Sequence, residues 1–446
     1  MRMFRTAFLG LALPALLAAQ GPVPELLGLQ ATLIGQDLRP FPSPYAGPNS
    51  LTGGGDRAVT QTYGAYFGVQ LTTRFQVYLD VELFRGSGVG KTVGLAGLPN
   101  GDAVRQGSGD LGQSPYLARL FGRWTLPLGG AEETIGRAMD QLPGRVPARR
   151  LVLTAGKLAA NDLFDTSAFA GAPRTQFMNW SLFNAPAWDF AADTRGYTRG
   201  LAAELYQPGW ALALGRFQMP TEANGNQLDA DLPRAHSDNV QLTLQPDGGP
   251  VIRLLAFANH ARMGDYAAAL AGANTGANTG VSTGVSTGAS AGAPDITATR
   301  RPGRAKRGWV LNLERPLDPE GAQGLFLRLA SNDGRTESFA FTEADRSLAF
   351  GGQARGRGSE DRWGLALSIQ DLSPGHRAYL AAGGQGFVLG DGRLAAAREQ
   401  VVEAYYAWAP RPWLRLSPDL QWIRNPGYNR DRGPAKVLGL RLRLSV

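Results

Sequence analysis

The end of the chain alternates, residue by residue, between apolar side chains and polar or small ones. In residues 435–446, AKVLGLRLRLSV, the apolar positions are Leu438, Leu440, Leu442, Leu444 and Val446. Side chains of a β-strand point alternately to opposite faces, so the other face carries Arg441 and Arg443. The preceding stretch, NPGYNRDRGP at residues 425–434, is rich in turn-forming residues and ends where the strand is expected to begin.

The same alternation recurs along most of the chain. In residues 74–83, for example, the polar Asp80 and Glu82 stand between valine and leucine residues. The chain has 59 glycines and 29 prolines but only 18% charged residues, which favours many short strands joined by turns. Candidate strands, about sixteen or seventeen in number, are residues 28–36, 61–71, 74–83, 116–126, 150–157, 197–206, 209–217, 238–245, 251–258, 307–314, 324–330, 336–342, 347–353, 361–370, 400–408, 413–423 and 435–446.

The polar faces of these segments carry charges that would be costly in a dry core but are stable beside water. These residues include Asp80, Glu82, Arg119, Arg123 and Arg362. Aromatic residues near strand ends suit the interfacial girdles of a membrane barrel: Tyr63, Phe67, Trp124, Trp210, Trp309, Trp363, Trp413 and Trp422. We therefore predict an all-β fold, a transmembrane antiparallel β-barrel of about 16 strands with an inward-folded constriction loop. In this barrel, residues 425–434 form the last external loop.

The N-terminus has the pattern of a secretory signal. Arg2 and Arg5 precede the apolar run at Thr6–Leu17, which is too short to span a bilayer. No other window approaches 18 consecutive apolar residues, which excludes a helical membrane protein. We predict a cleaved signal peptide at residues 1–20, a porin β-barrel at residues 21–446, and a location in the outer membrane of a Gram-negative bacterium.

Composition narrows the possible partners. Residues 272–293 contain the repeat ANTG-ANTG-VSTG-VSTG, whose small polar residues cannot bury a core, so we predict a low-complexity surface loop. The absence of cysteine excludes a reliance on disulfides. The net charge of +8 comes from basic residues scattered along the strands, and no nucleic-acid partner is expected. The denser RRPGRAKR at residues 300–307 is interpreted as a loop anchor.

Residues for catalysis or cofactor binding are sparse. The three histidines, His236, His260 and His376, stand in no metal-binding spacing, so neither a metal nor another cofactor is expected. No G-x-S-x-G motif marks a nucleophile, and no catalytic residue is assigned. GSGVGKT at residues 86–92 has too few residues between its glycines for a phosphate-binding loop and is interpreted as a turn.

Residues 156–200 combine charged and aromatic side chains at unusual density between two strand candidates. A connection of this length is generally functional, and folded inward it narrows the lumen and presents polar groups beside aromatic rings. This combination suits the hydroxyls and C–H faces of sugars. Alternatively, the aromatic residues pack the loop against the barrel wall. The candidate pore-lining residues are the donors Arg119, Arg123, Lys157, Arg174 and Arg195, the acceptors Asp80, Glu82, Asp165 and Asp189, and the stacking platforms Trp180 and Trp188.

Several longer motifs resemble those of one family. They are SPYAGPNSL (residues 43–51), GK with FD downstream (Gly156, Lys157, Phe164 and Asp165), PRTQFMNW (173–180), YLAAGGQGFVLGDGRL (379–394), SPDLQWIRNPGYNRDRGP (417–434) and the closing RLRLSV. With them the chain resembles the carbohydrate-selective outer-membrane porins of the OprB type. The resemblance implies a barrel of about sixteen strands in outer-membrane lipid, an aqueous pore with an inward-folded constriction, and passive diffusion of sugars such as glucose.

Two features depart from that family. The family usually ends in an aromatic residue, whereas this chain ends in Val446, and Arg443 stands where a histidine is expected. The ANTG/VSTG insertion is the second departure.

Three other functions remain open on the sequence alone. A divalent-cation porin would draw on a ring of carboxylates, namely Asp80, Glu82, Asp162 and Asp165, although nearby arginines raise the barrier to cations. An outer-membrane barrel hydrolase would use a serine with one of the three histidines. A secreted, soluble β-rich binding protein would alternate similarly but would rarely need so many strands. The sequence specifies neither the preferred solute nor whether a homo-oligomer forms.

Overall fold

The computed structural model describes residues 26–103, 111–274, 292–340 and 342–446. The predicted signal peptide at residues 1–20 and most of the low-complexity segment at residues 272–293 lie outside the described residues.

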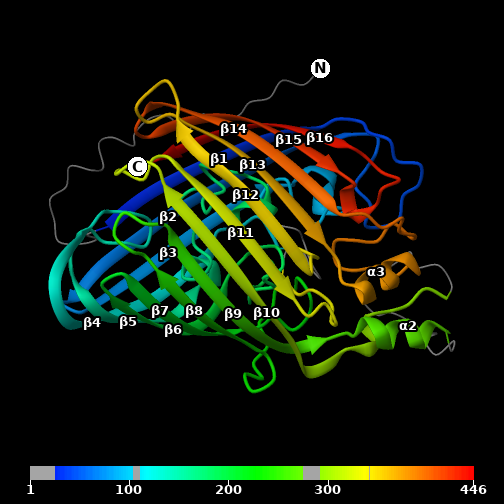
Figure 1. Ribbon diagram of the computed structural model, residues 1–446, viewed down its shortest axis with the longest axis horizontal. Coiled ribbons are helices and arrows are strands. Elements are labelled where there is room, and N and C mark those ends of the chain that lie inside the picture. The colour runs from blue at the N-terminus through cyan, green and yellow to red at the C-terminus, as the bar shows by residue number, and fades with distance from the viewer. Residues whose placement is uncertain (1–25, 104–110, 275–291, 341) are drawn as a thin grey trace.

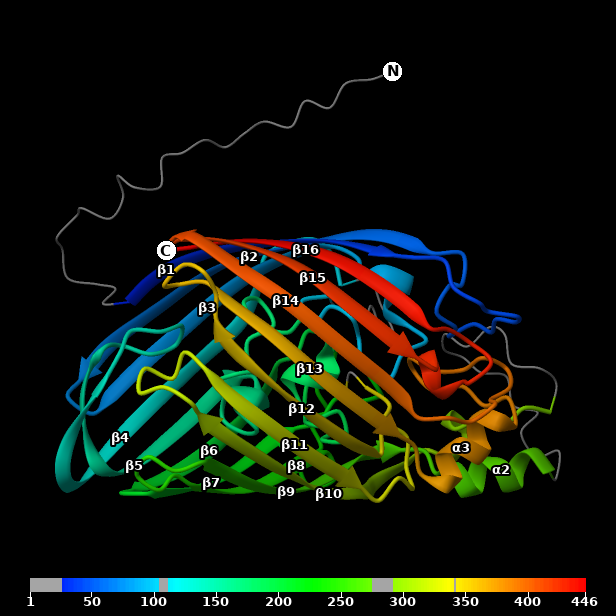
Figure 2. The same ribbon diagram turned by 45° about the horizontal axis from the view of Figure 1, so that its top comes forward.

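Sixteen strands form a closed antiparallel barrel in which consecutive strands are hydrogen-bonded neighbours (Figure 1). The sheet closes where β1 pairs with β16, with Ala31 opposite Leu444 and Leu38 opposite Val437. Closure leaves no free sheet edge, so strand backbone groups are paired within the protein, as a bilayer requires. Figure 2 shows the tilted strands wrapping around the interior.

The strands are β1 (Leu26–Leu38), β2 (Asp56–Thr72), β3 (Phe75–Gly86), β4 (Tyr116–Ile135), β5 (Gly144–Leu158), β6 (Thr198–Gln207), β7 (Trp210–Gln218), β8 (His236–Leu244), β9 (Val251–Met263), β10 (Arg301–Pro316), β11 (Gly324–Asn332), β12 (Arg346–Arg355), β13 (Arg362–Asp371), β14 (Glu399–Arg411), β15 (Leu414–Arg424) and β16 (Ala435–Ser445). The helices are α1 (Trp180–Phe183), α2 (Tyr266–Asn274) and α3 (Pro374–Ala381), with short 3-10 turns at Val89–Thr92, Ala160–Asp162, Thr297–Thr299 and Pro426–Tyr428. Over the described ranges, no helix has the length and apolar character needed to cross a bilayer.

One predicted strand, residues 336–342, is wrong. The described residues of this stretch lie in the connection between β11 and β12 and belong to no strand. Their backbone is satisfied differently, because the N–H groups of Phe339 and Ala340 donate to the carboxylate of Asp189 at 2.9 and 2.6 Å. The alternating sequence therefore predicted an extended chain here, but it could not show whether a neighbouring strand would pair with that chain.

The two ends of the barrel differ in the length of their connections. The first residues of β1, the C-terminus and the short turns, such as residues 208–209 and 412–413, lie at one end. The long connections lie at the other end, where α2 and α3 are found (Figure 1). In outer-membrane barrels short turns face the periplasm and long loops face outward. Residues 425–434 connect β15 to β16 at the long-loop end, as predicted.

The faces of β16 confirm the predicted alternation. Leu438, Leu440 and Leu444 are 39%, 52% and 37% exposed on the outside, whereas Arg441 is only 1% exposed and contacts the interior. Six of the predicted girdle residues are also exposed outside, namely Tyr63, Trp124, Trp210, Trp309, Trp363 and Trp413. An apolar outer face of this kind matches the surface that a barrel presents to lipid.

Leu440→Arg is expected to destabilise the barrel by about 2–4 kcal/mol in lipid, because Leu440 lies midway along the outer face of β16 and arginine is costly near the bilayer midplane. Guanidinium unfolding of protein refolded into vesicles measures the change. Leu440→Ala is the matched control and should cost less. Equal stability of the two variants would contradict a lipid-facing position for this residue.

Candidate pore constriction

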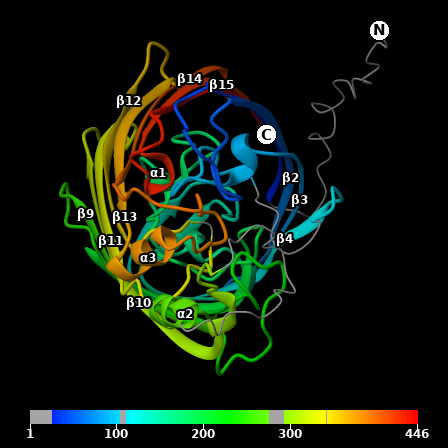
Figure 3. The same cartoon turned by 90° about the vertical axis from the view of Figure 1, so that its right-hand side faces the viewer.

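The connection between β5 and β6, residues 159–197, folds into the barrel. Figure 3 looks along the barrel from the long-loop end and shows α1 inside the ring of strands. Inward-pointing wall residues hold this segment, which we call the inner segment. One such contact is made by Glu403 on β14, whose carboxylate accepts hydrogen bonds from the backbone N–H groups of Met178 and Asn179.

The first charged anchor of the inner segment is Asp165. Its Oδ1 accepts from Nε of Arg328 on β11 at 2.9 Å and from Nδ2 of Asn312 on β10 at 3.1 Å. Its other carboxylate oxygen accepts from the N–H of Ala185 within the same segment at 2.9 Å. Asp165 and Arg328 are 2% and 1% exposed. Asp165, predicted as an acceptor for solute, therefore fixes the inner segment to the wall instead of facing the lumen.

Asp189 and Trp188 form the second anchor. The carboxylate of Asp189 lies 3.0 Å from Nζ of Lys306 on β10, and both side chains are buried. The indole N–H of Trp188 donates to Oδ1 of Asn239 on β8 at 3.1 Å, and Trp188 is 1% exposed. These two residues were also predicted to face solute, but they hold the inner segment against β8 and β10, beside the first anchor.

Trp180 differs from Trp188. Its ring packs on Phe183 and Phe190, with centroid distances of 4.9 and 5.9 Å. It also lines a cavity of about 340 Å³ between the inner segment and the wall formed by the first strands. Trp180 thus both packs the inner segment and borders open space, whereas Trp188 serves the packing role that the sequence left as the alternative.

This cavity, which we call the constriction cavity, is lined in part by Glu82 on β3. One oxygen of Glu82 accepts from Nη1 of Arg174 at 2.8 Å, and the other accepts from the hydroxyls of Tyr197 at 2.6 Å and Tyr116 at 3.0 Å. Nε of Arg174 also donates to Asp102 at 2.8 Å. Burial raises the pKa of Tyr197 well above its usual value, and the Glu82 carboxylate adds to this effect, so the phenol keeps the proton that it donates.

A second charged group surrounds Arg119 on β4. Its guanidinium donates to Oδ2 of Asp80 at 3.1 Å and makes two hydrogen bonds to Asp162, at 2.7 and 2.8 Å. Asp140 lies 3.5 Å from the same guanidinium, and burial raises the pKa of Asp140 although Arg119 opposes this. Asp162 borders both the constriction cavity and a larger cavity of about 1160 Å³ that reaches the short-turn end.

The remaining predicted donors occupy three different settings. Arg195 lines the constriction cavity, with its guanidinium 4.0 Å from the centre of the Tyr116 ring. Arg123 points inward and donates to the backbone carbonyl of Asp140 at 2.8 Å. Lys157 is not among the residues that line the cavity. It donates to the carbonyl of Leu117 at 2.8 Å and is paired in register with the exposed Leu120.

Sequence reasoning missed two residues of the constriction cavity, Asp102 and Tyr197, and the neighbouring Asp140. Asp102 lies outside the candidate strands and Tyr197 stands at the first position of the candidate strand 197–206, and nothing in their neighbourhoods singled them out. Asp140 lies in the connection between β4 and β5, which brings it to Arg119 on β4.

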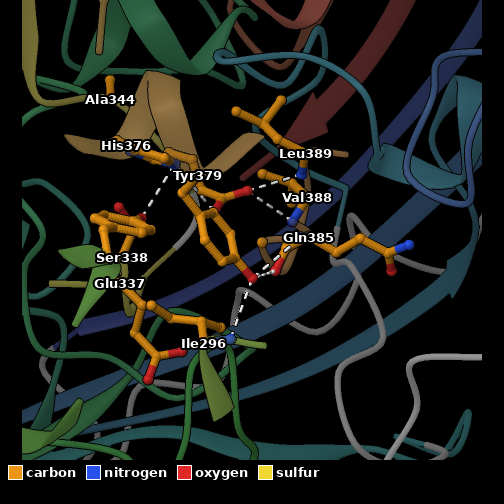
Figure 4. A network of polar contacts seen from close by, with 12 residues as sticks. Ile296, Glu337, Ser338, Ala344, His376, Tyr379, Gln385, Val388 and Leu389 are labelled. Carbon is orange, nitrogen blue, oxygen red and sulfur yellow. Dashed lines mark hydrogen bonds and ion pairs between the residues drawn. The ribbon is translucent and has the colours of Figure 1, made fainter. Parts of the chain in front are cut away.

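A polar network joins several of the long loops (Figure 4), at the end of the barrel where α2 and α3 lie (Figure 1). The buried ring of His376 on α3 lies 3.1 Å from Oδ2 of Asp345 and 3.1 Å from the hydroxyl of Tyr266 on α2. Burial acts to raise the pKa of Asp345, but His376, Lys306 and the N–H of Ser373 together hold that pKa below its usual value. The carboxylate of Glu343 accepts from the N–H groups of Val388 and Leu389 at 3.0 and 2.7 Å.

Among the described residues, no histidine ring is hydrogen-bonded to a serine, which is the pair that a hydrolase would need. In the described part of the chain, the ring of His376 contacts an aspartate and a tyrosine and has no exposed surface. His236 and His260 stack on β8 and β9 with ring centroids 4.6 Å apart. The described residues also contain no group of three acidic, histidine or cysteine side chains placed to hold a metal ion.

A closed barrel of sixteen strands with a chain segment folded into its lumen defines a porin-type channel of the outer membrane. Residues 70–445 match the family model described as "Carbohydrate-selective porin, OprB family". The chain therefore belongs to this family of sugar porins. No curated protein is significantly similar to it in sequence.

Solved structures share the fold at low sequence identity. The high-pH structure of OprB from Pseudomonas putida superposes with a TM-score of 0.63 at 14% identity, covering 95% of this chain and 94% of that one. The outer-membrane channel DcaP of Acinetobacter baumannii superposes with a TM-score of 0.50 at 10% identity, covering 94% of this chain and 96% of that one.

Proposed function

We propose that the constriction cavity is the selectivity filter of this sugar porin, through which small hydrophilic solutes pass by passive diffusion. The observation that carries the proposal is the pairing of its charges. Each carboxylate that lines the cavity is matched by a guanidinium: Glu82 and Asp102 by Arg174, and Asp162 by Arg119. Paired charges offer donors and acceptors to sugar hydroxyls and leave none of these carboxylates free to retain a cation. Trp180 adds an apolar edge beside them.

The paired charges also weigh against a divalent-cation porin. A ring that attracts cations needs carboxylates that no nearby cation neutralises. Glu82 and Asp162 already form ion pairs with arginines, at 2.8 and 2.7 Å. Osmotic swelling of vesicles that contain the protein separates the two functions. Glucose should enter quickly, and a gradient of calcium chloride should give no calcium-selective potential. A calcium-selective potential without glucose entry would overturn the proposal.

We also infer that residues 1–20 are a signal peptide removed on export, since an apolar run follows two arginines and ends in small residues. N-terminal sequencing of the protein extracted from outer membranes should begin near residue 21. An intact Met1 in that fraction would contradict cleavage.

A further inference from the structure

Four arginines lie on the inner face of the wall formed by β13, β15 and β16. They are Arg362, Arg415, Arg441 and Arg443. Arg415 is directly opposite Arg443 in the register of β15 and β16, and Arg441 is opposite the buried Ser417. Contacts with the inner segment show that Arg441 points inward. It donates to the carbonyls of Pro173 and Gln176 at 2.6 and 2.8 Å.

These arginines have no acidic partner, unlike four other arginines that point into the barrel. Arg119, Arg174, Arg253 and Arg328 each form an ion pair at 2.6 to 3.1 Å. Within the described ranges of the chain, no carboxylate lies within ion-pair distance of any of the four. Arg443 contacts only neutral groups, donating to Gln30 at 2.8 Å and Thr32 at 3.2 Å.

Several donors of this wall are also unused. Nε of Arg415, and both Nε and Nη2 of Arg441, are buried without a hydrogen-bond partner. A buried donor without a partner is costly, and like charges directly opposite each other on neighbouring strands repel. Arg415 and Arg443 are such a pair. The arrangement is therefore incomplete in electrostatic terms unless an anion is present.

Three carboxylates on the same wall make contacts with groups other than these arginines. Asp361 accepts from the N–H groups of Gly358 and Ala409 and from the hydroxyl of Tyr406 at 2.9, 2.9 and 2.8 Å. Glu403 holds the inner segment, and Oδ1 of Asp419 accepts from Gln421 at 3.1 Å, whereas Oδ2 of Asp419 has no partner among the described residues. None of these three carboxylates forms an ion pair with Arg415 or Arg443, so this opposed pair of arginines can accept an anion from outside the chain.

We propose that this wall, which we call the arginine wall, is a weak anion subsite, and that the sugars admitted by the porin include those that carry a carboxylate or a phosphate group. A guanidinium presents donors in a planar fork that matches both groups. Arg443 lines the constriction cavity, so a solute that passes the filter reaches the arginine wall directly. The inference rests on the proposed function, because it adds a class of charged sugars to the solutes that use the same diffusion path.

The test compares the entry of gluconate, glucose 6-phosphate and glucose into vesicles that contain wild-type protein or the Arg415→Gln variant. Arg415 makes no side-chain hydrogen bond in the described structure, so its replacement should leave folding intact. The ratio of anionic-sugar to glucose entry should fall roughly tenfold in the variant, and Arg415→Lys should recover part of it. Arg424→Gln, at an exposed position of the same strand, is the matched control and should keep the wild-type ratio.

The two solutes distinguish the two anion chemistries. A fall for gluconate alone assigns the subsite to carboxylates, a fall for glucose 6-phosphate alone assigns it to phosphates, and a fall for both supports a general anion subsite. An unchanged ratio for both solutes overturns the proposal. Absence of glucose entry in the wild type is a different result, because it would overturn the proposed function itself.

Discussion

Replacing Asp165 with alanine is expected to release the inner segment and raise single-channel conductance. Asp165 and Arg328 form a fully buried ion pair, and removing one partner leaves a buried charge without compensation. Such a loss costs about 3–5 kcal/mol, which is enough to detach a segment held by a few anchors. Planar-bilayer recordings should show larger and noisier openings than the wild-type channel.

A double replacement provides the control for this prediction. Asp165→Leu combined with Arg328→Met removes both charges and keeps apolar volume at the site, so it should disturb the inner segment less than Asp165→Ala alone. Asp318→Ala, which removes an ion pair at a short turn, should leave conductance unchanged. Wild-type conductance and noise in Asp165→Ala would show that this pair does not hold the segment.

Replacing Arg174 with alanine should make the channel prefer cations. Among the described residues, Arg174 is the only ion-pair partner of Glu82 and of Asp102, with each contact at 2.8 Å. Its loss leaves two carboxylates without a countercharge in the constriction cavity, where the low-dielectric wall strengthens their field. The permeability ratio of potassium to chloride should rise by roughly five- to tenfold, measured from reversal potentials in a potassium chloride gradient.

Arg174→Lys is the matched variant for this measurement. It keeps the positive charge but cannot bond Glu82 and Asp102 through one planar fork. We expect its ion preference to remain near that of the wild type. A wild-type reversal potential in Arg174→Ala would remove the cavity from the conduction path.

The barrel was predictable from the sequence because alternation is a local property. The outward leucines and inward arginines of β16 follow from spacing alone, and the constraint that charges must not face lipid fixes which side is inside. Residues 336–342 show the limit of that reasoning, since an alternating stretch became a loop whose N–H groups bond a distant carboxylate.

The roles of residues within the inner segment could not be predicted in this way. The sequence indicated that Asp165, Trp188 and Asp189 belong to an inward-folded segment, but their partners lie 163, 51 and 117 residues away in the chain. A charged residue of this segment can face either a solute or a buried countercharge. Which of the two it faces depends on the strand that lies opposite it in the closed barrel. Glu82 and Arg174, which the sequence also singled out, do line the constriction cavity together.

A single-channel recording with sugar present tests the central claim most directly, namely that the barrel encloses a water-filled path that admits sugars. Purified protein reconstituted in a planar bilayer should give stable conductance steps, and glucose added on either side should reduce the ionic current reversibly while it occupies the constriction. A membrane that shows no steps, or steps that glucose and other small sugars leave unchanged at saturating concentration, would contradict the account.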